Sequence, residues 1–259
     1  QAIAENNFLT NKPSDTFSKT AFLQLLSDKN IASQKGMVEH FDSTVLGNTC
    51  LMPFGGKYQL SPSDVSAHFI CEENYSTNTI SMASWGYDAE LTSANPFLGG
   101  MYAVIESVSK IVTAGGCFQE CYLTFQEYFE KLGNDPQKWG KPLSALLGAF
   151  EAQYQLEIAA IGGKDSMSGT FNEINVPPTL VSFAVTTGNA NNIISPELKK
   201  TNSYLYLYKM AVDHKHLPDW NKLKNDWNLI ASLIHHKKII SAKTIKKGGV
   251  AVALAKMSF

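Results

Sequence analysis

Apolar residues recur at two different spacings along the chain, and these spacings predict a mixture of strands and helices. Short runs rich in β-forming residues predict strands over residues 37–41, 65–71, 80–85, 121–125, 180–185, 203–209 and 239–240. Apolar positions spaced by three and four predict helices over residues 17–26, 95–113, 135–154, 220–235 and 248–257. Because the two kinds of element mix without strict alternation, the pattern favours an α/β fold of the mixed α+β kind, with a mixed sheet and packed helices.

Local signals mark the ends of the helix over residues 95–113. Asn95 can cap its N-terminus, Pro96 suits the first helical position, and Gly115 and Gly116 follow its end. The polar stretch 188–202, which is rich in asparagine, predicts a boundary between two units. We therefore expect a linker over residues 1–15, a first domain over 16–190 and the start of a second domain over 203–259. Both ends of the chain are interpreted as cut.

Composition excludes several classes of function. The net charge of -1 gives no overall basic field, so we expect no nucleic acid partner and no anionic membrane partner. No run of about 18 apolar residues and no signal-peptide pattern occurs, so no membrane crossing is expected. The four cysteines form neither a disulfide framework nor a zinc motif and predict reduced thiols in a cytoplasmic protein: Cys50, Cys71, Cys117 and Cys121.

The stretch with the clearest chemistry covers residues 162–169 and reads Gly-Gly-Lys-Asp-Ser-Met-Ser-Gly. Its glycines allow the backbone to approach a ligand closely, and the ammonium of Lys164 with the hydroxyls of Ser166 and Ser168 can donate to phosphate oxygens. The spacing of an ATP-binding Walker loop is absent, because Asp165 follows Lys164. Two interpretations remain open, an anion-binding loop and a surface turn with an exposed lysine and aspartate.

This stretch, followed by a Pro-Pro-Thr-Leu-Val-Ser-Phe-Ala strand, resembles the signature of large-type phosphoribosylformylglycinamidine synthases. Residues 41–47, 60–67 and 240–259 are similar to further motifs of that family, so the resemblance covers residues 16–259. It implies the second synthetase half: an N-terminal domain of the aminoimidazole ribonucleotide synthetase type, joined through its sheet to the first half, and a truncated α/β C-terminal domain.

The resemblance also implies a function. The family converts formylglycinamide ribonucleotide (FGAR), ATP and glutamine into formylglycinamidine ribonucleotide, ADP, phosphate and glutamate in purine biosynthesis. Expected partners are FGAR, the remaining synthetase half and the glutaminase domain, with a homodimer through the exposed sheet for the fragment alone. The full enzyme would use ATP or ADP and magnesium, and two alternatives stay open for the fragment: that it binds these cofactors or that it needs none. Because the catalytic residues belong to segments outside this chain, we expect the fragment to be inactive alone.

By resemblance, the residues that bind substrate phosphate and nucleotide are Gly162, Gly163, Lys164, Asp165, Ser166 and Ser168. The region equivalent to Gln126 and Glu127 lies near the nucleotide in the family, so these two residues are candidates for a supporting role there. The alternative function is a structural half that only supports the first half.

The family's second half also holds an auxiliary ADP with magnesium, and here the residues match only in part. Asp64 and Glu106 match two of the acidic ligands, but Lys110 replaces an asparagine and Thr244 replaces an aspartate. Magnesium prefers several hard oxygen ligands, so these replacements disfavour metal at Asp64 and Glu106. An ion pair between Glu106 and Lys110 could lie on the helix surface or inside the former site.

Lys243 and Lys246 lie in the segment that carries Thr244. Three states of this auxiliary site stay open: an empty site closed by salt bridges, a metal-free site for an anion or nucleotide, and a solvated basic face.

Overall fold

The computed structural model describes residues 18–70 and 77–259. The expected linker over residues 1–15, Phe17 and Cys71 lie outside these ranges. The α-helices are α2 (Lys19–Ser27), α3 (Lys35–Val38), α4 (Ala89–Ala94), α5 (Pro96–Thr113), α6 (Pro136–Leu156), α7 (Trp220–His235) and α8 (Gly249–Met257). The strands are β1 (Thr49–Leu51), β2 (Phe54–Gly55), β3 (Ser61–Pro62), β4 (Ser66–Phe69), β5 (Thr79–Gly86), β6 (Tyr122–Tyr128), β7 (Ala160–Lys164), β8 (Thr170–Phe171), β9 (Ile174–Asn175) and β10 (Thr179–Asn189).

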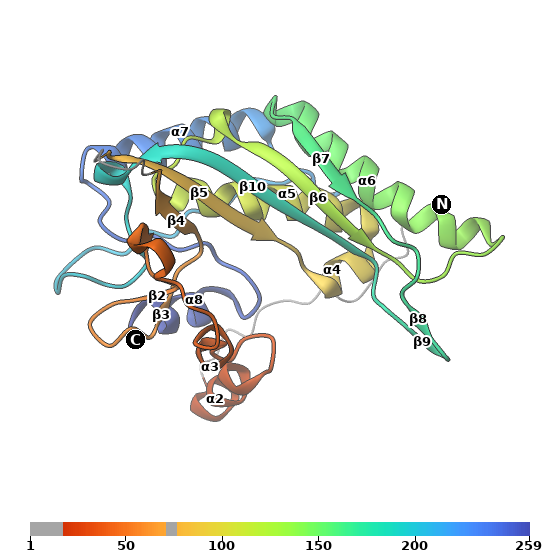
Figure 1. The fold of residues 1–259 in the computed structure, drawn as a ribbon, viewed down its shortest axis with the longest axis horizontal. Coiled ribbons are helices and arrows are strands. Elements are labelled where there is room, and N and C mark those ends of the chain that lie inside the picture. Colours follow the sequence, from red (N-terminus) through yellow and green to blue (C-terminus); the bar gives the residue numbers. More distant parts are fainter. Residues whose placement is uncertain (1–17, 71–76) are drawn as a thin grey trace.

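A six-stranded sheet in the order β1-β4-β5-β10-β6-β7 organises the fold (Figure 1). Its pairs are antiparallel except for β6 and β7, which are parallel. Parallel neighbours need a long crossover, and α6 lies in the connection between β6 and β7. β7 is the last strand in this order and is therefore an edge strand.

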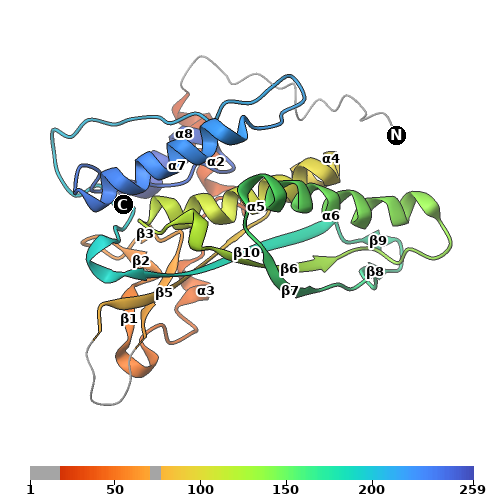
Figure 2. The ribbon, with the colours of Figure 1, turned by 90° about the horizontal axis from the view of Figure 1, so that it is seen from above.

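Helices α5 and α6 cover one face of the sheet (Figure 2). Along β5 the residues alternate, with Ile80 and Met82 fully buried against the helices and Trp85 exposed to 50% on the other face. α5 and α6 approach closely at two glycines: a Cβ on Gly100 would lie 2.1 Å from the Ala145 carbonyl oxygen. The opposite face of the sheet, called the open face below, carries further exposed apolar side chains: Tyr122, Tyr128 and Val185.

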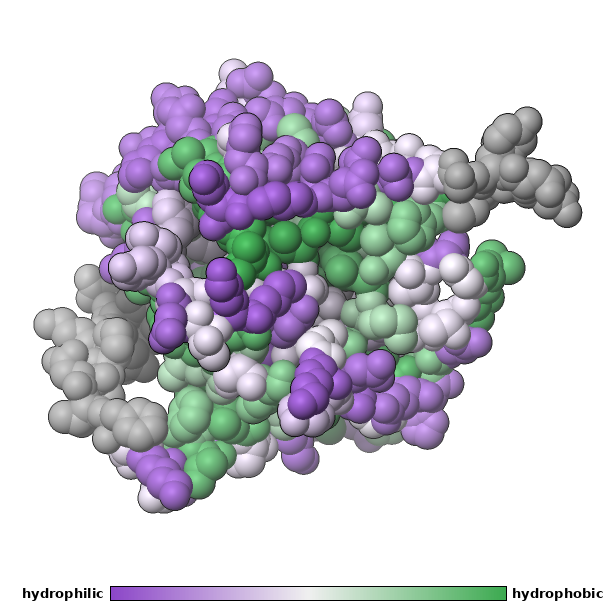
Figure 3. Space-filling model, turned by 90° about the vertical axis from the view of Figure 1, so that its left-hand side faces the viewer, coloured by the Kyte–Doolittle hydropathy of each residue, from purple (hydrophilic) through white to green (hydrophobic). Residues whose placement is uncertain are grey.

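The C-terminal part of the chain packs on this same framework. From α7, Leu223 and Trp227 enter the main hydrophobic core, and the Trp227 ring lies 5.4 Å from that of Phe118. Hydrophilic side chains gather along the upper edge of Figure 3, where α7 lies in Figure 1. α8 lies beside β3, and the Ser61 hydroxyl donates to the Phe259 carbonyl at 2.8 Å. The division into two domains stays a prediction.

The structure confirms the mixed α/β class, with a mixed six-stranded sheet and packed helices, and every expected helix. Three expected strands are wrong. Residues 37–41 begin within the short helix α3, and residues 203–209 and 239–240 pair with no strand in the described chain. β-forming residues make a strand only where a neighbouring strand supplies hydrogen bonds. Within residues 18–70 and 77–259, no helix combines the length and apolar character needed to cross a membrane.

Candidate functional site

The glycine-rich stretch lies at the edge of the sheet. Gly162, Gly163 and Lys164 belong to β7, where they pair with Thr124, Phe125 and Gln126 of β6, so the expected loop begins as a strand. Residues 161–165 are exposed. An edge strand directs every second backbone amide away from its sheet, and such amides are free to meet a ligand.

Gly163 is required by the close approach of the two strands. A Cβ at this position would lie 2.5 Å from the carbonyl oxygen of Phe125, a backbone atom that cannot move aside without shifting β6. At Gly162, by contrast, an added Cβ would meet no atom within 4 Å. The first glycine therefore leaves open space beside the strand, and the second holds the strand against the sheet.

A shallow depression of about 250 Å³ lies beside this strand. Its lining residues are Thr124, Phe125, Gln126, Gly163, Lys164 and Phe183. Lys164 forms no ion pair with any of the described residues. Beyond the strand, the hydroxyls of Ser166 and Ser168 lie 2.8 Å apart, and the backbone of Ser166 pairs with Glu127 and Phe129. An ammonium, hydroxyls and backbone amides thus lie along one edge, which is a suitable set for an oxyanion.

Two carboxylates, those of Glu127 and Asp165, interact near this edge. Burial, with a smaller contribution from Asp165, raises the pKa of Glu127 to about 7. The Oε1 atom of Glu127 is buried and has no hydrogen-bond partner among the described residues. A protonated Glu127 would leave Asp165 as the single negative charge of this pair, which reduces the repulsion that a bound anion would meet.

The residues of the expected auxiliary site form a second cluster at the end of β5 and beside α5, separated from β7 by β10 and β6. The Lys243 ammonium lies 2.9 Å from the Asp64 carboxylate and also donates to the Pro62 carbonyl. Lys246 lies 3.8 Å from the same carboxylate, and the backbone N–H of Thr244 donates to it at 3.2 Å. The ammonium groups of Lys243 and Lys246 and the backbone N–H of Thr244 thus converge on Asp64.

The second carboxylate of this cluster is held by its own helix. Lys110 lies 2.7 Å from Glu106 at the i,i+4 spacing, but its side chain is only 1% exposed, so the pair is not a surface pair. The Lys110 ammonium also donates to the Trp85 carbonyl and lies 4.3 Å from the centre of the Trp85 ring. Trp85 follows the last residue of β5 that pairs with β4. Lys110 therefore satisfies a carbonyl that the short strand β4 leaves open.

The charges of the cluster perturb one another. Burial lowers the pKa of Lys110 to about 8, with Lys246 adding to the decrease and Glu106 opposing it. Burial alone would raise the pKa of Asp64, but Lys243 and Lys246 outweigh it and hold that pKa below its ordinary value. Burial also lowers the pKa of Lys256 on α8, and Lys246 and Lys243 contribute to this decrease.

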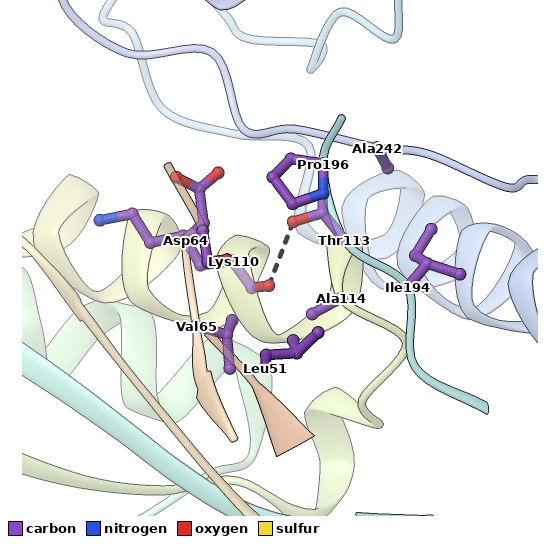
Figure 4. Close-up of a pocket in the computed structure, with 10 residues that line it drawn as sticks. Leu51, Asp64, Val65, Lys110, Thr113, Ala114, Ile194, Pro196 and Ala242 are labelled. Atoms are coloured by element: carbon purple, nitrogen blue, oxygen red, sulfur yellow. Dashed lines mark hydrogen bonds between the residues drawn. The ribbon is translucent and has the colours of Figure 1, made fainter. Parts of the chain in front are cut away.

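The cluster offers little to a metal ion. A cavity of about 10 Å³ lies beside this cluster, with Asp64 and Lys110 at one side and Ile194, Pro196 and Ala242 at the other (Figure 4). No three His, Cys, Asp or Glu side chains among the described residues group closely enough to hold a metal. Each carboxylate already has an ammonium partner, so the donor set does not fit a divalent cation.

The structure brings together the residues named from the sequence in each of the two places, and it adds neighbours that the sequence did not indicate. Trp85, Thr113 and Lys256 join the cluster around Asp64 without any motif to mark them, and Thr113 lies 3.3 Å from Thr244 through their hydroxyls. The raised pKa of Glu127 was also not predicted, although its place in an alternating strand next to a buried residue was a usable signal.

Comparison with known proteins identifies distant relatives. Phosphoribosylformylglycinamidine synthase subunit PurL of Pelagibacter ubique is 25% identical over 257 residues, which cover 92% of this chain and 33% of that protein. The same subunit of Bartonella quintana is 26% identical over 256 residues, covering 91% of this chain and 32% of that protein. The chain thus spans about a third of the length of the curated relatives it matches. No family model matches it.

Solved structures share the fold. PurLQS from Thermotoga maritima superposes with a TM-score of 0.57 at 18% identity, covering 79% of this chain and 30% of that chain. T. maritima PurL complexed with ADP gives a TM-score of 0.56 at 16% identity, over 87% of this chain and 33% of that chain. The same protein complexed with FGAR gives 0.55 at 19% identity, over 80% of this chain and 30% of that chain.

Proposed function

Because the chain is a distant homologue of the phosphoribosylformylglycinamidine synthase subunit PurL, we propose that it is the second synthetase half of such a ligase and supplies a phosphate-binding edge. Within a complete enzyme, the edge formed by residues 162–168 binds a phosphate group of FGAR or of the nucleotide. The chain alone does not complete the reaction.

One observation carries this proposal. On β7, the exposed Lys164 has no ion-pair partner among the described residues and lies next to two glycines at the rim of the sheet. An unpaired ammonium beside outward backbone amides favours an anionic ligand, and the hydroxyls of Ser166 and Ser168 extend the same edge. Gly162 keeps the space beside the strand free for that ligand.

The chemistry required of this edge is modest. In the proposed reaction, the γ-phosphoryl group of ATP passes to the amide oxygen of FGAR, and ammonia from glutamine then displaces phosphate at that carbon. Catalysis of this kind depends on positioning and on stabilising charge that develops on oxygen. Lys164 and the outward backbone amides of β7 would hold the phosphate in place, while ATP and magnesium would bind chiefly through segments outside this chain.

The open face of the sheet offers a docking surface for a partner protein next to this edge. Trp85, Tyr122, Tyr128 and Val185 expose between 39% and 57% of their surface there, and the depression beside Lys164 lies on the same face. Exposed aromatic patches of this kind mark interaction surfaces. The first synthetase half is the proposed occupant, and a second copy of the chain takes its place when the chain is alone. The glutaminase domain completes the proposed enzyme, which functions in the cytoplasm.

A second candidate is a structural half without a ligand of its own. The ion pairs around Asp64 and Glu106 favour it, because they fill the position where the family binds an auxiliary nucleotide. The two candidates differ only at the edge formed by residues 162–168.

Binding of sulfate and of FGAR to the chain, measured by calorimetry, separates them. We expect Lys164→Gln to weaken sulfate binding by roughly 5- to 15-fold, because a charge-assisted hydrogen bond contributes about 1–1.5 kcal/mol at an exposed site. Lys238→Gln, an exposed lysine that follows α7, is the matched control and should leave binding unchanged. Equal affinities for the two variants, or no binding by the unaltered chain, would favour the structural half.

A further inference from the structure

Both carboxylates of the cluster around Asp64 are largely buried and already neutralised by ammonium groups. The Asp64 and Lys243 side chains are 10% and 3% exposed, and those of Glu106 and Lys110 are 18% and 1% exposed. A buried charge is tolerated when it is paired and hydrogen-bonded, and these pairs meet that condition. Any metal entering the cluster would first have to displace a buried lysine.

The cavity beside Asp64 and Lys110 is also too small for a ligand. The cavity between Asp64, Lys110 and Thr113 measures about 10 Å³, which is at the lower limit for one water molecule. Magnesium keeps six oxygen ligands at about 2.1 Å, several of them water, and a nucleotide needs far more room. Three ammonium groups face two carboxylates here, so an excess of positive charge already opposes a divalent cation.

The cluster joins parts of the chain that are distant in sequence. Asp64 lies between β3 and β4, whereas Lys243 and Thr244 lie between α7 and α8. The Thr113 and Thr244 hydroxyls connect the end of α5 to the same segment at 3.3 Å. These contacts fasten residues 243–246 to the sheet and to α5.

We propose that lysine ammonium groups have permanently replaced the metal-nucleotide group at this position, so that Lys243 holds the C-terminal segment against Asp64 and Lys110 holds α5 against the end of β5 without any cofactor. Lys110 neutralises Glu106 and satisfies the Trp85 carbonyl, while Lys243 neutralises Asp64 and satisfies the Pro62 carbonyl. The replacement makes the fold of this region independent of ADP and magnesium. It concerns a different site from the phosphate-binding edge and is tested separately.

Thermal unfolding of the unaltered chain tests the absence of the cofactor. A ligand that binds the folded state raises the unfolding midpoint with concentration, so millimolar ADP with magnesium chloride, or EDTA, should shift the midpoint by less than about 1 °C. A concentration-dependent rise that Asp64→Asn abolishes would overturn the proposal. A rise that Asp64→Asn leaves intact would place the ligand elsewhere, for example at residues 162–168, and would uphold it.

Two lysine variants test the replacement itself. Lys243→Met should lower the unfolding midpoint by roughly 6–15 °C, because removing one partner of a buried ion pair leaves the other buried without its charge. Lys222, which is 50% exposed, forms an ion pair with Asp226 on the surface. Lys222→Met breaks this pair and should shift the unfolding midpoint by less than about 2 °C. Equal shifts for these two variants would overturn the proposal.

A double variant keeps the test decisive if Lys243→Met does not fold. Asp64→Asn combined with Lys243→Met removes both charges, so no unpaired carboxylate remains, and it should unfold at a higher temperature than Lys243→Met alone. A double variant that is less stable than Lys243→Met would contradict the role of the ion pair.

Discussion

Replacing each of the two glycines of β7 by alanine should have opposite effects on stability. In Gly163→Ala the new Cβ would lie 2.5 Å from the Phe125 carbonyl oxygen, so β7 must move away from β6 and weaken its hydrogen bonds. Forcing an extra carbon into a packed position costs about 1–3 kcal/mol. Gly162→Ala places its Cβ where no atom lies within 4 Å, and it should stabilise the chain by about 0.4–1 kcal/mol through the lower entropy of the unfolded state.

Urea unfolding of the two variants, with sulfate titration of each, measures this difference. The free energies of unfolding should differ by roughly 1.5–4 kcal/mol in favour of Gly162→Ala. Sulfate binding should weaken in both variants, because one displaces the strand and the other fills the space beside it. Equal stabilities would refute the close approach of Gly163 to β6, and unchanged sulfate binding in both would refute the placement of the ligand.

Three further predictions concern other parts of the molecule. Because the folded state raises the pKa of Glu127 to about 7, the free energy of unfolding should fall as the pH rises from the ordinary pKa of a glutamate through 7. In urea unfolding at a series of pH values, Glu127→Gln should flatten this dependence. Gly148→Ala on α6 would place a Cβ 1.8 Å from the Phe97 carbonyl oxygen and should lose about 1–3 kcal/mol, whereas Gly140→Ala on the same helix, with no atom within 4 Å, should gain up to about 1 kcal/mol. Tyr122→Lys should reduce self-association through the open face in sedimentation, while unchanged self-association would exclude that face.

Much of the framework could be predicted from local patterns. Asn95 accepts a hydrogen bond from the backbone of Leu98 and Pro96 begins α5, as their sequence positions indicated. The buried alternation along β5 and β10 follows the period of two that apolar residues show there. These features were accessible because caps and periodicity are decided within a few neighbouring residues.

The remaining features depend on partners that are distant in sequence. β7 was expected as a loop because its Gly-Gly pair shows no period of two, and only the β6 neighbour makes it a strand. Residues 203–209 were expected as a strand but expose Tyr204 and Tyr206 to 87% and 90%, since no described strand pairs with them. The contact of Lys243 with Asp64 spans 179 residues, and no local pattern reports such a contact.

Amide NMR of the labelled chain during a titration with sulfate tests directly whether the edge formed by residues 162–168 binds an oxyanion. We expect saturable shifts at amides of β7, including those of Gly162 and Gly163, with half-saturation at a sulfate concentration roughly 5- to 15-fold higher in Lys164→Gln. Shifts confined to residues 243–246, or no saturable shift in β7, would contradict this expectation.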